Sequence, residues 1–318
     1  MSLDIVSISR RELLLRGVQA GAGVFAVGAL SSCGSLRSGR GGKAGPAIRF
    51  GLTTYQWGKD WDIPTLIANC QKAEALGVEL RTSQSYAHGV ELDLDPEQRK
   101  DVKKLFDDSP IELVGLATSE GFDSPDPAQL KTAIENAKAF VKLDSDIGGS
   151  GIRVFPNSFH NEVPREKTIE QIGRALNVVG AFAADYGQQI RLEAHGTAGE
   201  LSSLKAIMEH VTEPSVRIKL NCDNRDAAGE GFEHNFNLVK DDLGCTIHAH
   251  DFKDESYPYQ LMMDLLVKNE WSGWILVENS SKVPDRVAAL IEQRQIFEQM
   301  LAKSRGGLTK SMNRAKAT

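Results

Sequence analysis

Short apolar runs rich in β-branched residues alternate with longer amphipathic segments from residue 47 onward. The short runs predict strands, and the longer segments with helical periodicity predict helices. Eight strands are predicted, at Ile48–Thr54, Val78–Thr82, Ile111–Ala117, Ile152–Pro156, Gln189–His195, Val216–Asn221, Cys245–His250 and Trp274–Glu278. Because each is followed by a helical segment, the pattern predicts an α/β fold, a (β/α)8 TIM barrel.

Capping and turn residues mark where the predicted helices begin and end. Asp95 and Pro96 open the helix after the second strand, since aspartate is a preferred N-cap and proline is favoured at the first helical position. Gly77 follows the predicted helix Ile63–Leu76, where a left-handed cap is expected. The glycine cluster at 148–151 precedes a strand. It therefore predicts a turn at the barrel bottom rather than a phosphate site, because anions bind at loops that follow strands.

The segment before residue 47 lacks this alternation. Arg10 and Arg11 precede a mildly apolar stretch, Gly17–Leu30, that is too short and too rich in glycine and alanine to span a bilayer. The arginine pair resembles a twin-arginine export signal, and the residues up to Cys33 resemble a lipobox whose cysteine becomes lipidated. The alternative is an amphipathic helix of a cytoplasmic protein, but no polar face runs along this stretch. We therefore expect an exported protein, periplasmic or anchored to the membrane through that lipid.

Length and composition agree with one barrel. The 318 residues lie within the range of a single α/β barrel, and 41% hydrophobic residues suffice for a buried core. We expect a signal peptide over 1–33, a flexible spacer rich in Gly, Ser and Arg over 34–46, the barrel over 47–303 and a polar tail over 304–318. The formal net charge of −6 argues against a nucleic-acid partner, since phosphate backbones bind clustered Lys and Arg.

Acidic, amide and imidazole groups gather where the last four predicted strands end. They are Glu193 with His195, Asn221 with Asp223, His248 with His250, and Glu278. Residues two apart on a strand point to the same face, and sites in these barrels lie at the carboxyl ends of the strands. Each residue alone is more often structural. Together they favour a cation, because unpaired buried charges are costly, and the mixed oxygen and nitrogen donors suit Mn²⁺, Mg²⁺, Co²⁺ or Zn²⁺.

Four motifs carry a resemblance to a known family. They are Arg191–His195, Leu220–Asn224, His248–His250 and Trp274–Glu278. They resemble the successive metal-site motifs of the xylose isomerase-like TIM barrel superfamily, and the resemblance covers nearly the whole chain after the signal. Stretches such as His88–Glu91 are similar to exported proteins labelled sugar phosphate isomerase/epimerase. The resemblance implies that Glu193 and Glu278 are metal-binding carboxylates and that His250 is the imidazole ligand, with His248 as its alternate.

The sixth predicted strand departs from the family pattern. Family members usually have an aspartate first in an Asp-x-x-Asn run, whereas this chain has Asn221 first and Asp223 two residues later. Either Asp223 reaches the metal from the same face, or Asn221 binds it through the weaker amide oxygen.

The resemblance also implies a mechanism. One divalent ion would chelate the carbonyl oxygen and neighbouring hydroxyl of an open-chain sugar, while Glu193 and Glu278 remove and return the proton at the adjacent carbon. His195 would orient Glu193 or a sugar hydroxyl. The loops after the early strands supply candidate sugar-binding residues, namely Tyr55, Trp57, Arg81, His88, Glu120, Asn157 and His160.

Other functions fit part of this pattern. A lyase or hydrolase acting on 3-keto-glycosides would begin with the same proton abstraction. A barrel endonuclease would need more His and Asp ligands and a basic groove, which the acidic balance opposes. A non-catalytic sugar-binding barrel is the third alternative, favoured by the departure at Asn221. The expected partner is a small carbohydrate, and the oligomeric state stays open, a homo-oligomer included.

Overall fold

The computed structural model describes residues 47–315, with side chains described as far as residue 308. The predicted signal peptide, spacer and lipidation of Cys33 lie outside these residues. Within the described part of the chain, no helix combines the length and apolar character needed to cross a bilayer.

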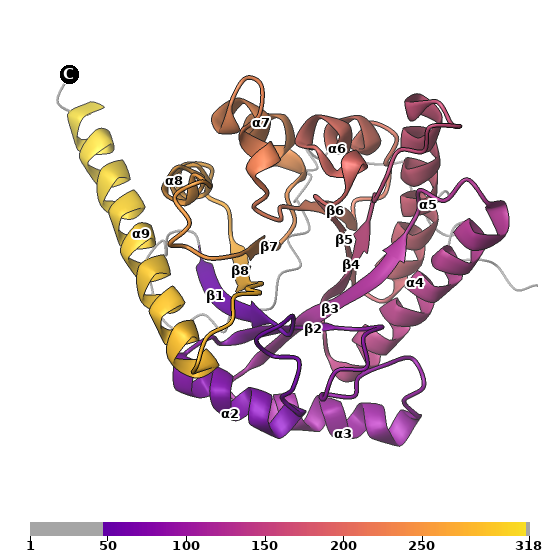
Figure 1. Cartoon of the computed structure of the whole chain (residues 1–318), viewed down its shortest axis with the longest axis horizontal. Coiled ribbons are helices and arrows are strands. Elements are labelled where there is room, and N and C mark those ends of the chain that lie inside the picture. The colour runs from indigo at the N-terminus through magenta and orange to yellow at the C-terminus, as the bar shows by residue number, and fades with distance from the viewer. Residues whose placement is uncertain (1–46, 316–318) are drawn as a thin grey trace, which may run out of the picture. The chain divides into compact units, whose positions relative to one another are not determined.

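Eight parallel strands form one sheet that curves into a nearly closed barrel (Figure 1). They are β1 (Ile48–Thr53), β2 (Gly77–Arg81), β3 (Glu112–Gly121), β4 (Gly151–Phe155), β5 (Gln189–Glu193), β6 (Val216–Lys219), β7 (Thr246–Ala249) and β8 (Gly273–Val277). The order is β6-β5-β4-β3-β2-β1-β8-β7. Between β6 and β7, an isolated bridge joins Ile218 to Leu243, and the amide of His248 donates to the carbonyl of Leu220. The predicted (β/α)8 TIM barrel is confirmed.

Helices follow the strands and cover the outside of the sheet (Figure 1). They are α2 (Ile63–Ala73), α3 (Pro96–Asp107), α4 (Pro127–Ile147), α5 (Arg165–Asp185), α6 (Leu201–Met208), α7 (Phe232–Val239), α8 (Tyr259–Lys268) and α9 (Arg286–Ala315), with 3-10 turns η1 (Thr197–Gly199), η2 (Asn224–Ala227) and η3 (Lys240–Asp242). Asp95 caps α3, as the sequence predicts, and it forms a capping box with Gln98. Helix α9 continues through most of the expected tail.

The predicted left-handed cap at Gly77 was wrong. The left-handed residue after α2 is Glu74, with φ of 53°, and Gly77 is the first residue of β2. A Cβ at Gly77 would lie 2.5 Å from the Trp274 ring, so this glycine is required by close packing inside the barrel. At the other glycine cluster, Gly148 does cap α4 in the left-handed region and leads into β4.

The main hydrophobic core lies between the sheet and its helices, but the barrel interior is largely polar. Inside, Val114, Trp274 and Leu276 form a small separate apolar cluster. Among strand residues, the charged side chains with at most 1% exposure are Glu79, Arg153, Arg191, Glu193, Lys219 and His248. Barrels of this type usually fill their interior with branched apolar residues, so a layer of buried charge needs partners and points to a site.

Candidate active site

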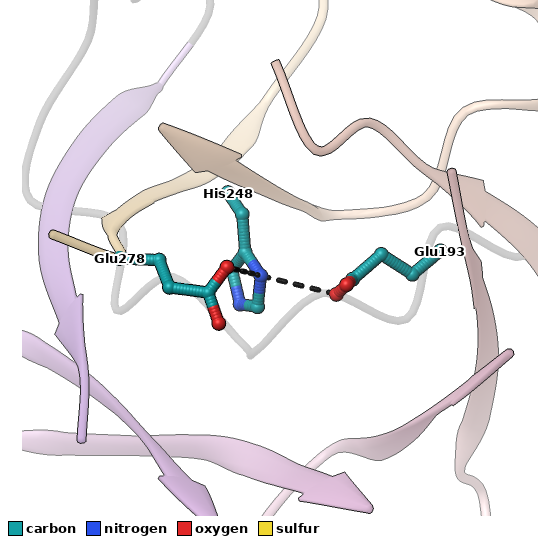
Figure 2. Close-up of side chains that lie close together, drawn as sticks. All are labelled: Glu193, His248 and Glu278. Carbon is teal, nitrogen blue, oxygen red and sulfur yellow. Dashed lines mark ion pairs between the residues drawn. The ribbon is translucent and has the colours of Figure 1, made fainter. Parts of the chain in front are cut away.

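The carboxyl ends of β5 and β8 bring two glutamates to the same imidazole. Glu193 is the last residue of β5, Glu278 follows β8 directly, and His248 lies in β7. One donor atom from each of these residues lies within 4.8 Å of the others. Figure 2 shows the two carboxylates approaching the His248 ring from opposite sides. Parallel strands thus bring the two predicted glutamates to one site although 85 positions separate them in sequence.

His248 contacts three carboxylates. Its Nδ1 lies 3.0 Å from Glu193 Oε2 and 3.4 Å from Glu278 Oε2, while its Nε2 lies 2.5 Å from Glu79 Oε2. Burial and the nearby Lys219 ammonium disfavour the charged ring, but the three carboxylates outweigh them and raise the pKa of His248 to about 10.

Each glutamate is also paired with an arginine. Glu193 Oε1 accepts from Arg153 at 3.1 Å, and Glu278 Oε1 accepts from Arg81 at 3.4 Å. Burial raises the pKa of the Glu193 carboxyl, but Arg153 and His248 outweigh it and the pKa is lowered. The pKa of Glu278 is lowered in the same way, with His248 as the main opposing cause. Both carboxylates are therefore ionised at neutral pH.

Three residues of this network escaped the sequence analysis. Lys219 Nζ lies 2.7 Å from both oxygens of Glu79, and both side chains are fully buried. Arg153 is the third, with 1% exposure. A signal was present in the sequence, because each of these charged residues lies between two apolar residues of a predicted buried strand. A charge buried there needs a partner.

A cavity of 270 Å³ opens over the two glutamates. This volume lies just below the usual range of roughly 300–1,000 Å³ for ligand sites, so the cavity suits a small ligand. Its lining consists of Tyr55, Arg81, Arg153, Phe155, Glu193, His195, Asn221, His250, Glu278 and Ser280. Seven of these ten were singled out from the sequence, and Arg153, Phe155 and Ser280 were not.

The structure separates Asn221 from Asp223. Asn221 lines the cavity, whereas Asp223 caps η2 and forms an ion pair with Arg225 at 2.8 Å. Between them Cys222 has φ of 49°, which breaks the strand geometry that would have placed both side chains on one face. The amide is therefore the group that β6 presents to the cavity.

His248 and His250 also occupy different positions relative to the cavity. His250 lines the cavity, and its Nδ1 lies 2.9 Å from the carbonyl oxygen of Glu278. His248 lies beneath it with no exposed surface. His195 packs against Phe155 at 4.4 Å between ring centroids, and burial lowers its pKa.

The remaining predicted sugar-binding residues do not line this cavity. Trp57 is 3% exposed and donates to a loop carbonyl, and both ring nitrogens of His88 contact backbone atoms of the β2 loop. Asn157 and His160 lie around Asp123 at 3.3 Å and 3.1 Å. Glu120 accepts from Asn136. These contacts hold loops in place, and a role in substrate binding stays a prediction for all five residues.

The donor set fits a divalent cation. Among the described residues, Asn221 Oδ1 is a buried polar atom without a hydrogen-bond partner, and Glu193 Oε2 and His248 Nδ1 are paired only by charge, at 3.0 Å from each other. Such atoms are costly unless a ligand satisfies them, and carboxylate oxygen with imidazole nitrogen is a common metal-binding combination. Glu79 contacts the far nitrogen of His248, as a supporting carboxylate does for a metal-binding histidine. Arg153 and Arg81, which pair with the same glutamates, would compete with such an ion.

Comparison with known proteins finds matches among solved structures and in one family model. No curated protein matches the sequence significantly. Among solved structures, an L-ribulose 3-epimerase matches with a TM-score of 0.69 and 15% identity over 83% of this chain and 98% of the other. A 3-keto-D-glucoside 4-epimerase from E. coli matches with 0.65 and 14% over 81% and 99%. A D-allulose 3-epimerase from Methylomonas sp., in complex with D-allulose, matches with 0.66 and 17% over 80% and 98%.

At these identities the likeness to solved structures shows the fold. The sequence itself matches the family described as "Xylose isomerase-like TIM barrel" over residues 67–300, which is most of the chain. With the barrel topology and the strand-end site in agreement, this chain belongs to the xylose isomerase-like TIM barrel family.

Proposed function

We propose that this protein is a divalent-metal-dependent carbohydrate isomerase or epimerase that moves a proton at the carbon next to a carbonyl group. The observation that carries the proposal is the convergence of Glu193 and Glu278 on His248 beneath a cavity that suits a small ligand. The similar solved structures, which are sugar epimerases, support the same reaction class.

The proposed cation is Mn²⁺, Mg²⁺, Co²⁺ or Zn²⁺, held by Glu193, Glu278, one imidazole and the amide oxygen of Asn221. His248 is favoured as the imidazole because its Nδ1 lies 3.0 Å from Glu193 and 3.4 Å from Glu278, and one donor atom from each of these three residues lies within 4.8 Å of the others. When bound, the ion supplies electrostatic stabilisation of the negative charge that develops on the sugar oxygens.

Glu193 and Glu278 are the proposed proton-transfer groups. Both are ionised, and they come from opposite sides of the His248 ring, so one can take a proton from a sugar carbon and the other can return one. A low pKa makes a weak base. Filling the cavity with substrate excludes water from both carboxylates, which raises their basicity. Arg153 holds Glu193 in place, and His195 is positioned to orient a sugar hydroxyl.

The test is exchange of the proton next to the carbonyl. Purified protein with Mn²⁺ in D₂O is incubated with D-fructose, D-allulose, D-tagatose and L-ribulose, and deuterium uptake and epimer formation are followed by NMR. We expect uptake from at least one ketose, and Glu278→Gln should reduce its rate by about 10² or more. Glu97→Gln, on an exposed turn of α3, is the matched control. Release of the aglycone from a 3-keto-glycoside without any ketose exchange would contradict the proposal and favour a lyase.

We also propose that the protein is exported, on the basis of its N-terminal sequence alone. Arg10→Lys with Arg11→Lys should leave the protein in the cytoplasm, because twin-arginine transport reads both guanidinium groups. Cell fractionation measures this. Equal export of the double variant would contradict the predicted signal, and unchanged membrane association of Cys33→Ala would contradict the lipid anchor.

A further inference from the structure

We infer that the cavity takes a sugar acid, a monosaccharide whose carboxylate is bound by Arg153 and Arg81. The inference rests on the proposed function for the carbohydrate nature of the ligand and narrows it to one chemical class.

Arg153 lines the cavity, and one hydrogen-bonding edge of its guanidinium group has no partner among the described residues. Its Nη1 donates to Glu193, but Nε and Nη2 are buried and have no hydrogen-bond partner in the described part of the chain. These two nitrogens form one side of the guanidinium plane, which is the side that binds a carboxylate through two parallel hydrogen bonds. The Phe155 ring lies 4.0 Å from the guanidinium carbon and fixes its plane. A buried donor pair of this kind is costly unless a ligand satisfies it.

Arg81 brings a second guanidinium to the same cavity from β2. It lies 3.4 Å from Glu278, and its Nε is also buried without a partner among the residues described. The Tyr55 ring lies 4.9 Å from its guanidinium carbon and limits its movement. Both arginines line the cavity, so one anionic group can contact them together.

The charges around the cavity favour an anionic ligand. Side chains of permanent charge in this network are the carboxylates of Glu79, Glu193 and Glu278 and the cations of Arg81, Arg153 and Lys219. These six charges cancel when His248 is neutral, as an imidazole that binds a metal ion must be. Addition of the proposed divalent ion leaves a surplus of positive charge in a poorly solvated site, which a neutral sugar does not offset and a carboxylate reduces.

The test compares matched sugars in a binding assay. Isothermal titration of the Mn²⁺-loaded full-length protein with D-fructuronate and D-fructose, and with D-tagaturonate and D-tagatose, isolates the effect of the carboxylate. We expect each acid to bind about tenfold or more tightly than its neutral partner, the scale of a charge-assisted contact.

Two variants identify the groups responsible. Arg81→Gln should remove most of the preference for the acid. Arg153→Lys keeps a positive charge beside Glu193, which preserves the fold, but it loses the two-nitrogen edge and should lose preference as well. Lys205→Gln, which lies outside the cavity in a pair with Asp242, should leave the preference unchanged.

Equal or tighter binding of the neutral sugars would overturn the inference, as would a preference for the acids that persists in both arginine variants. The two proposals fail separately. If D-fructose takes up deuterium and binds as tightly as D-fructuronate, the proposed function holds and the sugar-acid site is wrong. If the acids bind through the arginines but no sugar exchanges a proton, the sugar-acid site holds and the proposed function is wrong.

Discussion

Glu79 Oε2 lies 2.5 Å from His248 Nε2, and both oxygens of the same carboxylate lie 2.7 Å from Lys219 Nζ. One carboxylate from β2 thus compensates two cationic side chains from β6 and β7 in the centre of the barrel. All three side chains have no exposed surface. Removal of one partner leaves the remaining charges buried without compensation, which lowers the stability of the folded state.

Glu79→Gln should therefore destabilise the protein strongly. We expect the free energy of unfolding to fall by about 3–5 kcal/mol, measured by urea denaturation. Glu97→Gln, which breaks an exposed pair with Lys100, is the control and should change it by less than about 0.5 kcal/mol. A loss at Glu79 no larger than that of the control would show that the buried network contributes nothing to stability.

Asn221→Asp should strengthen metal binding. The cavity then offers a carboxylate in place of the unpartnered amide oxygen, and hard cations prefer charged oxygen ligands. We expect Mn²⁺ affinity, measured by isothermal titration, to rise by roughly tenfold or more. Asp223→Asn, which removes only the partner of Arg225, should have little effect. Weaker binding in Asn221→Asp would place the ion away from β6.

The identity of the imidazole ligand can be decided by the same titration. We expect His248→Gln to abolish Mn²⁺ binding, and His250→Gln to retain it, because His248 lies nearer both glutamates. Chelation of the metal should lower the melting temperature of the wild type, since an ion that binds the folded state stabilises it by mass action. Loss of binding in His250→Gln alone would reverse the assignment.

The buried carboxyl of Asp144 predicts a pH dependence of stability. It accepts a 2.8 Å hydrogen bond from the amide of Gly151 at the start of β4, and burial raises its pKa from 3.8 to about 8. Between these values the folded state binds the proton and the unfolded state does not, so stability falls as pH rises from about 4 to about 8. Asp144→Asn cannot ionise and escapes this loss.

The difference in melting temperature, variant minus wild type, should grow from pH 5 to pH 8 and then level off, as measured by calorimetry. Asp185→Asn, at the exposed end of α5, should show no such trend. A difference independent of pH would mean that Asp144 is ionised throughout.

Gly196, in the loop after β5, should tolerate no side chain. Its φ is 71°, and a Cβ would lie 2.0 Å from the carbonyl oxygen of Asn157. Gly187 has a similar φ of 65°, but its Cβ would have open space. Gly187→Ala should therefore cost about 1 kcal/mol from backbone strain, and Gly196→Ala clearly more. Equal losses in urea denaturation would show that the loop yields to the added methyl group.

The fold and half of the site follow from local sequence features. Apolar runs in the sequence predict where the strands lie. The residues at the strand ends could therefore be named without knowledge of any contact. Because parallel strands end at one edge, Glu193 and Glu278 were expected near one another, and the structure brings them to the same histidine. Nothing beyond sequence supports the signal peptide and lipid anchor, which stay predictions.

Other features depended on contacts between distant residues. Lys219 and Glu79 are separated by 140 positions, so neither side chain reveals its partner until the barrel closes. Asn221 lines the cavity and Asp223 does not, and the positive φ angle of Cys222 between them cannot be inferred from their two-residue spacing. The sequence determined where each strand ends, since burial of apolar runs is a local pattern. The tertiary structure decided which charges meet, because compensation of a buried charge depends on distance in space.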